Sequence, residues 1–495
     1  MAKEKDLIIQ APRQGIAQSP HVGFGNMRNL DIYTVPGVAK LNNILVKKSS
    51  TTVDAQVKWI VKNPASPANV YALDSNGVMY TSADSGASWT ETSDRGGAGQ
   101  GLAVWKDYLF VFEDTTVDVF GPLSGSPTWD DNWATIGTAA AWHPTFISNN
   151  DGNLYFGCGR YIGMITEASG QDFDPDTSAT YAGSTLGTSA DNSLDLPEDY
   201  KIKCLSELGN NLMIGTWQGT NIYDNKIADI FPWDRSATSF GQPVKMTENG
   251  VNSMINIGGY LYIQAGIDGK IYKSNGVQAS VIAQIPLSIA DTSNAKYLEP
   301  YPGAIINFKG RPFFGISSAD VASGMGIYSL METSKGTILN FEHFISEEIT
   351  GSANPTVIGA LLGITRDQLV VGWRNHATYG IDQTSTASFA YTTDYGGYFE
   401  SPLYSVGTTL NKRAFTQLEF QLAKELATDE GIQIKYRVNL TDTFTTIGTY
   451  TFAILGAVTS HNVTADIPAC DQLQIRVELL GTATTTPEFK SLTLR

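Results

Sequence analysis

Two acidic segments hold the residues best suited to chemistry. DFDPD (172–176) and WDDNW (129–133) place Asp side chains beside aromatic residues. Glycoside hydrolysis requires a pair of carboxylates, and aromatic rings could stack on a sugar substrate. Asp-rich segments are more often solvated turns, some of which bind Ca²⁺ opportunistically. We therefore expect turns here and assign no catalytic residue to either segment.

Metal and cofactor signatures are missing from the sequence. The three cysteines form no CxxC pair, and the five histidines show no HxH or HExxH spacing. No GxSxG, Walker loop or strand-linked GxGxxG occurs. The sequence thus predicts no metal site, no nucleotide site and no cofactor. The cysteines are Cys158, Cys204 and Cys470, and the histidines are His21, His143, His343, His376 and His461.

The segment SADSGASW (82–89) resembles the Asp box of sialidase-like β-propellers. In such a box Ser and Asp hydrogen-bond within a tight hairpin, Gly takes a positive φ, and Trp packs under the turn. The resemblance implies a structural staple on a blade rim. A degenerate copy, TTDYGGYF (392–399), implies a related hairpin on the other side of the ring's closure. The matching positions are Ser82, Asp84, Gly86 and Trp89, then Thr392, Asp394, Gly396 and Phe399.

A sialidase reaction is not expected from this resemblance. Sialidases use an arginine triad, a Tyr–Glu pair and an acidic Asp, usually with a Phe/Tyr-Arg-Ile-Pro segment near the N-terminus. Only GRPFF (310–314) is similar to that segment, and it lies late in the chain, lacks the Ile and is flanked by Gly. We interpret it as the start of a strand, because fold alone does not imply activity.

The elements that would position these residues are β-strands. Helical periodicity is scarce, and a pair of short apolar strands recurs seven times, at a spacing of roughly 40 to 60 residues. This pattern predicts an all-β fold with a propeller of about seven blades over residues 45–400; six blades is the alternative. The pairs are NVYAL (69–73) with GVMY (77–80), YLFVF (108–112) with VDVF (117–120), NLYFG (153–157) with YIGMI (161–165), NLMIG (211–215) with TNIY (220–223), YLYIQ (260–264) with KIY (270–272), PFFGI (312–316) with GIY (326–328), and QLVVG (368–372) with TYGI (378–381).

Residues outside the repeat form two further parts. From residue 401 to residue 495, strands such as IQIKYRV (432–438) and LQIRVEL (473–479) alternate strictly, which predicts an antiparallel β-sandwich. Residues 1–44 contain three prolines and no clear alternation. We expect them to form an extended N-terminal arm of the kind often ordered only against a partner.

Both flanking parts also resemble proteins of tailed-bacteriophage virions. GIAQSPHVGFGNMRNLDIYTVPGVAKLNN (15–43) is similar to the opening of tail nozzle proteins of short-tailed phages, and FESPLYSVGTTLNKRAFTQLEFQLA (399–423) to virion segments that leave a propeller for a sandwich. In those nozzle proteins a propeller follows the opening, and this chain is shorter than their best-known members. The matching positions are Gly15, Ile16, Gln18, Pro20, Asn29, Gly37 and Lys40.

This resemblance implies a non-enzymatic structural protein of the phage tail, a subunit of a cyclic homo-oligomer expected to be a hexamer. Its partners would be other copies of itself and adjacent tail or connector proteins. The net charge of −16 disfavours sequence-specific nucleic-acid binding but suits a conduit through which duplex DNA passes. Two alternatives stay open: a tail protein that recognises or degrades host-surface glycans through propeller loops, and an interaction protein unrelated to phage.

The hydropathy of the sequence indicates where in the cell the protein would be made and whether it would span a membrane. No run of about 18 apolar residues occurs, so we expect no membrane span, and the N-terminus lacks the apolar region of a secretory signal. These observations predict synthesis in the host cytoplasm, and the resemblance to phage tail proteins implies residence in the virion tail.

Overall fold

The chain divides into two compact units in the computed structural model, and strands dominate both. One unit comprises residues 46–325 and 347–383; the other comprises 1–45, 326–346 and 384–495. The expected all-β composition is confirmed, since one four-residue helix, α1 (Phe452–Leu455), accompanies the strands of the described residues. Described are residues 6–12, 16, 26–49, 53–136, 140–166, 181–182, 193–219, 226–285, 301–317, 325–333, 336–347, 356–375, 377–386, 388–389 and 396–495.

The first unit consists of antiparallel sheets that repeat one up-and-down pattern. The first sheet along the chain consists of β6 (Val57–Lys62), β7 (Val70–Asp74), β8 (Val78–Ser82) and β9 (Thr90–Asp94). The second consists of β10 (Gly101–Trp105), β11 (Tyr108–Phe112), β12 (Thr116–Gly121) and β13 (Thr128–Thr135). The third consists of β14 (Thr145–Ile147), β15 (Leu154–Cys158), β16 (Tyr161–Ile165) and β17 (Tyr181–Ala182), and β18 (Leu194–Asp195) also pairs with β16. The next are β19 (Tyr200–Leu208), β20 (Asn211–Gln218), β21 (Asp229–Trp233) and β22 (Val244–Lys245); and β23 (Val251–Ile257), β24 (Tyr260–Ala265), β25 (Lys270–Ser274) and β26 (Ala279–Gln284). After the hairpin of β27 (Ile305–Phe308) and β28 (Arg311–Ile316) come β31 (Thr356–Gly363), β32 (Leu369–Asn375), β33 (Thr378–Thr384) and β5 (Leu45–Lys47).

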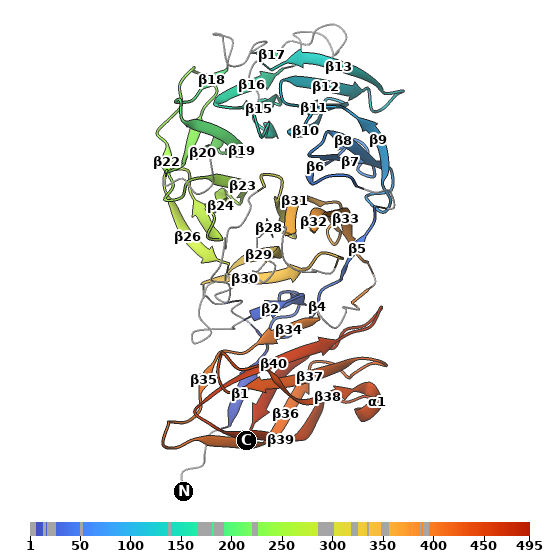
Figure 1. The fold of residues 1–495 in the computed structure, drawn as a ribbon, viewed down its shortest axis with the longest axis vertical. Coiled ribbons are helices and arrows are strands. Elements are labelled where there is room, and N and C mark those ends of the chain that lie inside the picture. The colour runs from blue at the N-terminus through green and yellow to red at the C-terminus, as the bar shows by residue number, and fades with distance from the viewer. Residues whose placement is uncertain are drawn as a thin grey trace. The chain divides into compact units, whose positions relative to one another are not determined.

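The first strands of these sheets form a closed cycle. β6 contacts β10, and contacts continue through β14, β19, β23, β27 and β31 back to β6. Figure 1 shows the sheets of this unit arranged around that cycle. Sheets that radiate from a ring of first strands define a β-propeller. The predicted propeller fold is therefore supported by contacts within the chain itself.

Glycine permits neighbouring sheets to approach closely. Four of the repeated segments carry a Gly on the second strand of a sheet, where a Cβ atom would collide with a β-branched residue on the first strand of the next sheet. The recurring Gly therefore marks a contact between blades. The pairs are Gly157 with Ile202, Gly215 with Val251, Gly315 with Ile358 and Gly372 with Val57.

One predicted strand is placed differently. NLMIG (211–215) lies in β20 as expected, but its described partner is β21, where Leu212 faces Trp233. The predicted partner TNIY (220–223) lies outside the described residues. The strands β10, β19, β23, β27 and β31 each directly precede an apolar strand of the repeat.

The second unit contains two antiparallel sheets and the hairpin of β29 (Gly326–Thr333) and β30 (Gly336–His343). Inward side chains of both sheets, such as Phe420 and Val477, belong to one hydrophobic cluster. One sheet has the order β1 (Leu7–Gln10), β41 (Phe489–Leu494), β36 (Arg413–Leu422) and β39 (Ser460–Cys470). The other has the order β2 (Asn26–Arg28), β34 (Gly397–Glu400), β40 (Gln472–Leu480), β37 (Gly431–Arg437) and β38 (Thr445–Thr451), with β35 (Tyr404–Ser405) also paired to β40.

The N-terminal segment takes part in these sheets. β1 pairs with β41, and β2 pairs with β34, so strands from residues 1–44 complete both sheets of the C-terminal region. A small hairpin of β3 (Leu30–Asp31) and β4 (Lys40–Leu41) follows. The segment expected to be an arm ordered by a partner is thus paired, over these strands, with its own chain, because both sheets leave an edge that it fills.

Candidate functional site

The hairpin between β8 and β9 contains the Asp-box residues of the first copy. Ser82 Oγ donates to Asp84 Oδ1 at 2.7 Å and accepts from the Gly86 amide at 2.8 Å. Asp84 accepts from the Ser88 amide at 2.8 Å and from its hydroxyl at 2.6 Å. Burial acts to raise the pKa of Asp84, but the hydrogen bonds from Ser88 and Ser82 outweigh it and hold that pKa below its ordinary value.

Trp89 connects this turn to the hydrophobic core. Its indole Nε1 donates to the Gly86 carbonyl at 3.1 Å, where Gly86 has a φ of 85°. The buried ring belongs to a cluster that includes Val70 of β7 and Val370 of β32. Gln383 Nε2 of β33 also donates to the Ser85 carbonyl at 2.7 Å. The box hairpin therefore contacts both sheets that meet where the ring closes, which is the geometry of a staple.

The second copy is only partly described. Thr392 and Asp394 lie outside the described residues. Gly396 precedes β34, and Phe399 lies within that strand, opposite Met27 and Val477. Phe399 is fully buried in the core of the second unit. It packs between strands of that unit, whereas Trp89 packs under a propeller turn.

Of the two acidic segments, the structure describes only one. DFDPD (172–176) lies outside the described residues. WDDNW (129–133) belongs to β13 and is not the turn that we expected, because it pairs along β12. Asp131 forms an ion pair with Arg95, whose guanidinium also donates to Asp118 at 2.8 Å and 2.9 Å. GRPFF begins a strand as interpreted, since Arg311 is the first residue of β28.

Buried thiols and imidazoles show no metal geometry in the part of the chain that is described, where no cluster of three or more potential metal ligands occurs. Cys158, Cys204 and Cys470 are buried, and burial raises the pKa of the Cys204 thiol to about 12. Burial also lowers the pKa of His143, which contacts the Gly157 carbonyl at 2.9 Å. Among the described helices, none is long and apolar enough to cross a membrane.

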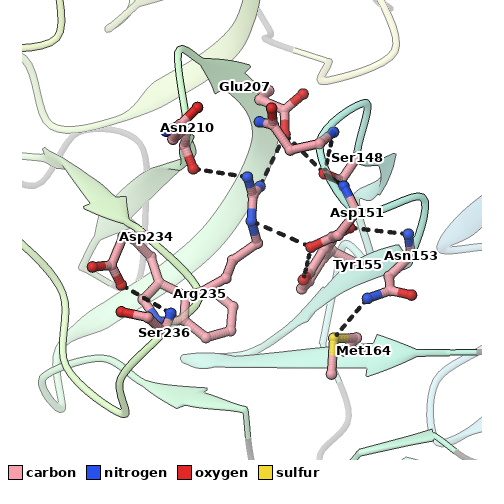
Figure 2. A network of polar contacts seen from close by, with 12 residues as sticks. Ser148, Asp151, Asn153, Tyr155, Met164, Glu207, Asn210, Asp234, Arg235 and Ser236 are labelled. Carbon is pink, nitrogen blue, oxygen red and sulfur yellow. Dashed lines mark hydrogen bonds and ion pairs between the residues drawn. The ribbon is translucent and has the colours of Figure 1, made fainter.

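A polar network joins two neighbouring propeller sheets, as Figure 2 shows. Arg235, in the loop after β21, forms an ion pair with Glu207 of β19 at 2.9 Å, and both side chains are 8% exposed. The same guanidinium lies 3.4 Å from Asp151 in the turn between β14 and β15, and donates to the Asn210 carbonyl at 2.7 Å. Each of the three guanidinium nitrogens of Arg235 has a polar contact within the fold, so we interpret this network as a structural clamp.

The ring's centre is occupied by a tryptophan. Trp142, just before β14, lies with its ring centroid 4.7 Å from Lys58 Nζ and 5.5 Å from Lys203 Nζ. Lys58 belongs to β6 and Lys203 to β19, which are not neighbours in the cycle of first strands. A side chain that contacts both must lie near the middle of the ring. Cation–π contacts there hold first strands on opposite sides of the propeller together.

Within the part of the chain that the structure describes, a groove between two adjacent sheets is a candidate binding site. It lies between β6–β9 and β10–β13 and has a volume of about 440 Å³. Leu109, Phe120 and Trp129 form one wall, and they stand directly opposite one another on β11, β12 and β13. The other wall includes the paired residues Tyr71 and Thr81. The full lining is Asn69, Tyr71, Met79, Thr81, Ser82, Ala83, Thr92, Leu109, Phe120 and Trp129.

The groove lining is aromatic and uncharged. Phe120 and Trp129 lie with ring centroids 4.7 Å apart, and the Arg95 guanidinium covers Trp129 at 4.0 Å. Because Arg95 is already paired with Asp118 and Asp131, it offers no unpaired positive charge beside the groove. Burial, followed by the charge of Asp107, raises the pKa of Tyr71, so its phenol stays protonated at neutral pH. The sequence signalled Trp129 but not its partners, because only the pairing of separate strands brings them together.

Comparisons with known proteins find only distant structural similarity. No protein-family model matches the sequence, and no curated protein matches it. A structure of RRP9 WD40 repeats is 11% identical, covers 68% of this chain and 98% of its own, and has a TM-score of 0.45. YCF48 bound to a D1 peptide is 9% identical, with coverages of 74% and 100% and a TM-score of 0.43. An exo-β-1,3-galactanase from Phanerochaete chrysosporium is 10% identical, with coverages of 92% and 100% and a TM-score of 0.34. Similarities at this level carry no inference about activity, so the fold assignment rests on the contacts between strands.

Proposed function

We propose that this chain is a non-enzymatic structural protein of a bacteriophage virion, a subunit of the tail nozzle ring through which DNA is ejected. Six copies would form a closed ring, and the ring would contact adjacent tail or connector proteins. Cyclic symmetry is the common solution for identical subunits. Such a protein acts through its interfaces, so it needs neither a catalytic group nor a cofactor.

The number of propeller blades and the C-terminal β-sandwich are also part of this proposal. We infer that the propeller has seven blades, one for each first strand in the closed cycle, and that the last residues form a β-sandwich. A shared hydrophobic cluster between the two sheets of the second unit supports the sandwich. The observed order of parts, propeller and then paired sheets, agrees with the order in the nozzle proteins that the sequence resembles.

The observation that best supports the nozzle proposal concerns the N-terminal motif. Asn29 is fully buried with a φ of 55°, and its side chain accepts from the Phe344 amide at 3.1 Å. Gly37 has a φ of 80°. Lys40 forms an ion pair with Asp31 at 3.5 Å. Three positions that carry the resemblance therefore have specific structural tasks, as expected of a motif that encodes how this segment folds.

The acidic balance supports a conduit rather than a nucleic-acid grip. With a net charge of −16, a ring of copies would repel duplex DNA from its wall during ejection. The conduit of such a ring lies between subunits and is separate from the centre of each propeller, where Lys58 and Lys203 surround Trp142.

Mass photometry of the purified chain, followed by electron cryomicroscopy of the source particle, tests the nozzle proposal. A six-fold ring on the tail axis would support it. A chain that stays monomeric at high concentration and is missing from purified virions would overturn it. A basic lining of the conduit would contradict the proposed role of charge.

The second candidate function is glycan recognition by a phage tail protein. The aromatic groove between β6–β9 and β10–β13 favours it, because small-molecule sites are typically concave, apolar and supplied with a few polar groups. A trimer located on peripheral fibres, in place of an axial ring, would support this candidate over the nozzle.

A further inference from the structure

We propose that copies of this chain associate through one side of the second unit, formed by β38, the loop that contains α1, and the first half of β39. These elements span residues 443–465, and no Asp, Glu, Lys or Arg occurs among them. We call this surface the uncharged edge. The inference rests on the proposed ring of identical subunits and names the surface to which a second copy would bind.

Both sheets of the second unit end in an open strand on this side. β38 is the last strand of one sheet and β39 of the other, and no described strand pairs with the outer side of either. An open edge presents N–H and C=O groups to other chains, and charged residues or Pro usually protect it. β38 has neither, and β39 has Asp466 and Pro468 only in its second half. The edge of β38 is therefore open to pairing with a strand of another chain.

The loop between these two strands presents an apolar side chain beside the open edge. Phe452 and Leu455 pack against the hydrophobic core of the second unit and so anchor the loop. Ile454, between them in the sequence, is 67% exposed, and the nearby Ala453 and Ala457 are exposed as well. An anchored apolar side chain loses little conformational freedom when a partner covers it. Exposed apolar groups next to an unprotected edge are typical of a protein contact.

The distribution of charge indicates that the partner is a second copy. The propeller unit has 19 Lys and Arg against 33 Asp and Glu, whereas the second unit has 14 against 16. Most of the net charge of −16 thus belongs to the propeller, so two copies repel each other least through their second units. Contact through the uncharged edge brings no like charges together, and the centres of protein interfaces are depleted of charge. A membrane is a poorer partner, because this surface offers no Lys or Arg to anionic lipid.

Sedimentation velocity of the purified full-length chain, over a range of concentrations, tests this surface. For the wild type we expect oligomers that become tighter as salt rises from about 50 to about 500 mM, because salt screens repulsion between acidic copies. Ile454→Asp and Thr446→Glu each place a charge at an exposed position of the uncharged edge. Each should weaken association at least about tenfold without lowering the unfolding temperature. Leu410→Asp, at a 94% exposed leucine of the same unit, is the matched control and should associate like the wild type.

The possible results separate this surface from the nozzle proposal. If the Ile454 and Thr446 variants form the wild-type oligomer equally well, the uncharged edge is refuted while the ring proposal survives. A wild-type dimer that both variants lose would support the uncharged edge and contradict a six-fold ring. A wild-type chain that stays monomeric, or oligomers that dissociate as salt rises, would overturn the inference. Ile454-dependent binding to phosphatidylcholine vesicles by a monomeric chain would also overturn it, because lipid would then be the partner.

Discussion

Replacing Gly372 by Ala should weaken the closure of the propeller ring. A Cβ atom at this position would lie 2.6 Å from Val57 Cγ1 and 3.4 Å from the Val57 carbonyl oxygen. Val57 is fully buried on β6 and β-branched, so its side chain cannot rotate away freely. The overlap must be relieved by separating β32 from β6. Overpacking of this kind lowers the free energy of unfolding by about 1–3 kcal/mol.

The double variant Gly372→Ala/Val57→Ala isolates the cause of that loss. Val57→Ala alone creates a cavity and costs stability, but it also makes room for the new methyl group. Urea unfolding of the wild type, both single variants and the double variant should give a favourable coupling energy of at least about 0.5 kcal/mol. Gly125→Ala is the control, because its nearest neighbour would lie at 3.4 Å in an exposed turn. Additive losses, or an unaffected Gly372→Ala, would refute close packing as the reason for glycine here.

Three further perturbations test other contacts. Asp84→Ala removes the hydrogen bonds of the box turn and should cost about 1–2 kcal/mol in urea unfolding at pH 7. Because the pKa of Asp84 is lowered in the fold, its contribution to the free energy of unfolding is complete above the unfolded pKa and disappears as pH falls through the folded pKa. A stability difference between wild type and Asp84→Ala that grows in acid would contradict this assignment. Arg235→Met should cost about 1–3 kcal/mol by removing the ion pair with Glu207, which keeps its hydrogen bonds from Ser148 and the Asn149 amide, and adding Glu207→Gln should recover part of the loss. Equal stability of Arg235→Met and wild type would disprove the clamp. Cys204, with a pKa of about 12, should resist iodoacetamide at pH 8 in the native chain and react after unfolding, as measured by mass spectrometry.

The repeat was predictable from sequence because each blade supplies its own local pattern. YLYIQ (260–264) and KIY (270–272) are close in the chain, mostly buried and joined by a turn, and they form β24 and β25 as expected. Pairings between distant segments were not predictable in this way. Nothing in LIIQ (7–10) indicates that it pairs with the last strand, since edge pairing depends on which sheet edge is open.

The residues of the candidate groove could also be predicted from the sequence only in part. Trp129 stands out in the sequence beside two aspartates, and it does line the groove. Tyr71 and Thr81 are ordinary residues of an alternating strand, and only the juxtaposition of two sheets gives them a common role. Asp-box residues, in contrast, form their contacts within eight positions of one another, so the turn geometry could be anticipated.

The strand β5 gives the propeller a particular order of assembly during synthesis. β5 lies beside β33, and Ile381 donates to Ser49 Oγ across 332 positions of sequence. A ribosome makes β5 early and β33 very late, so β5, the first-made strand of the propeller, must wait unpaired until nearly the whole ring has emerged. Closing so long a loop costs entropy before any contact repays it, which makes ring closure a slow step. Until then, β5 and the growing ring both present open edges to other nascent chains.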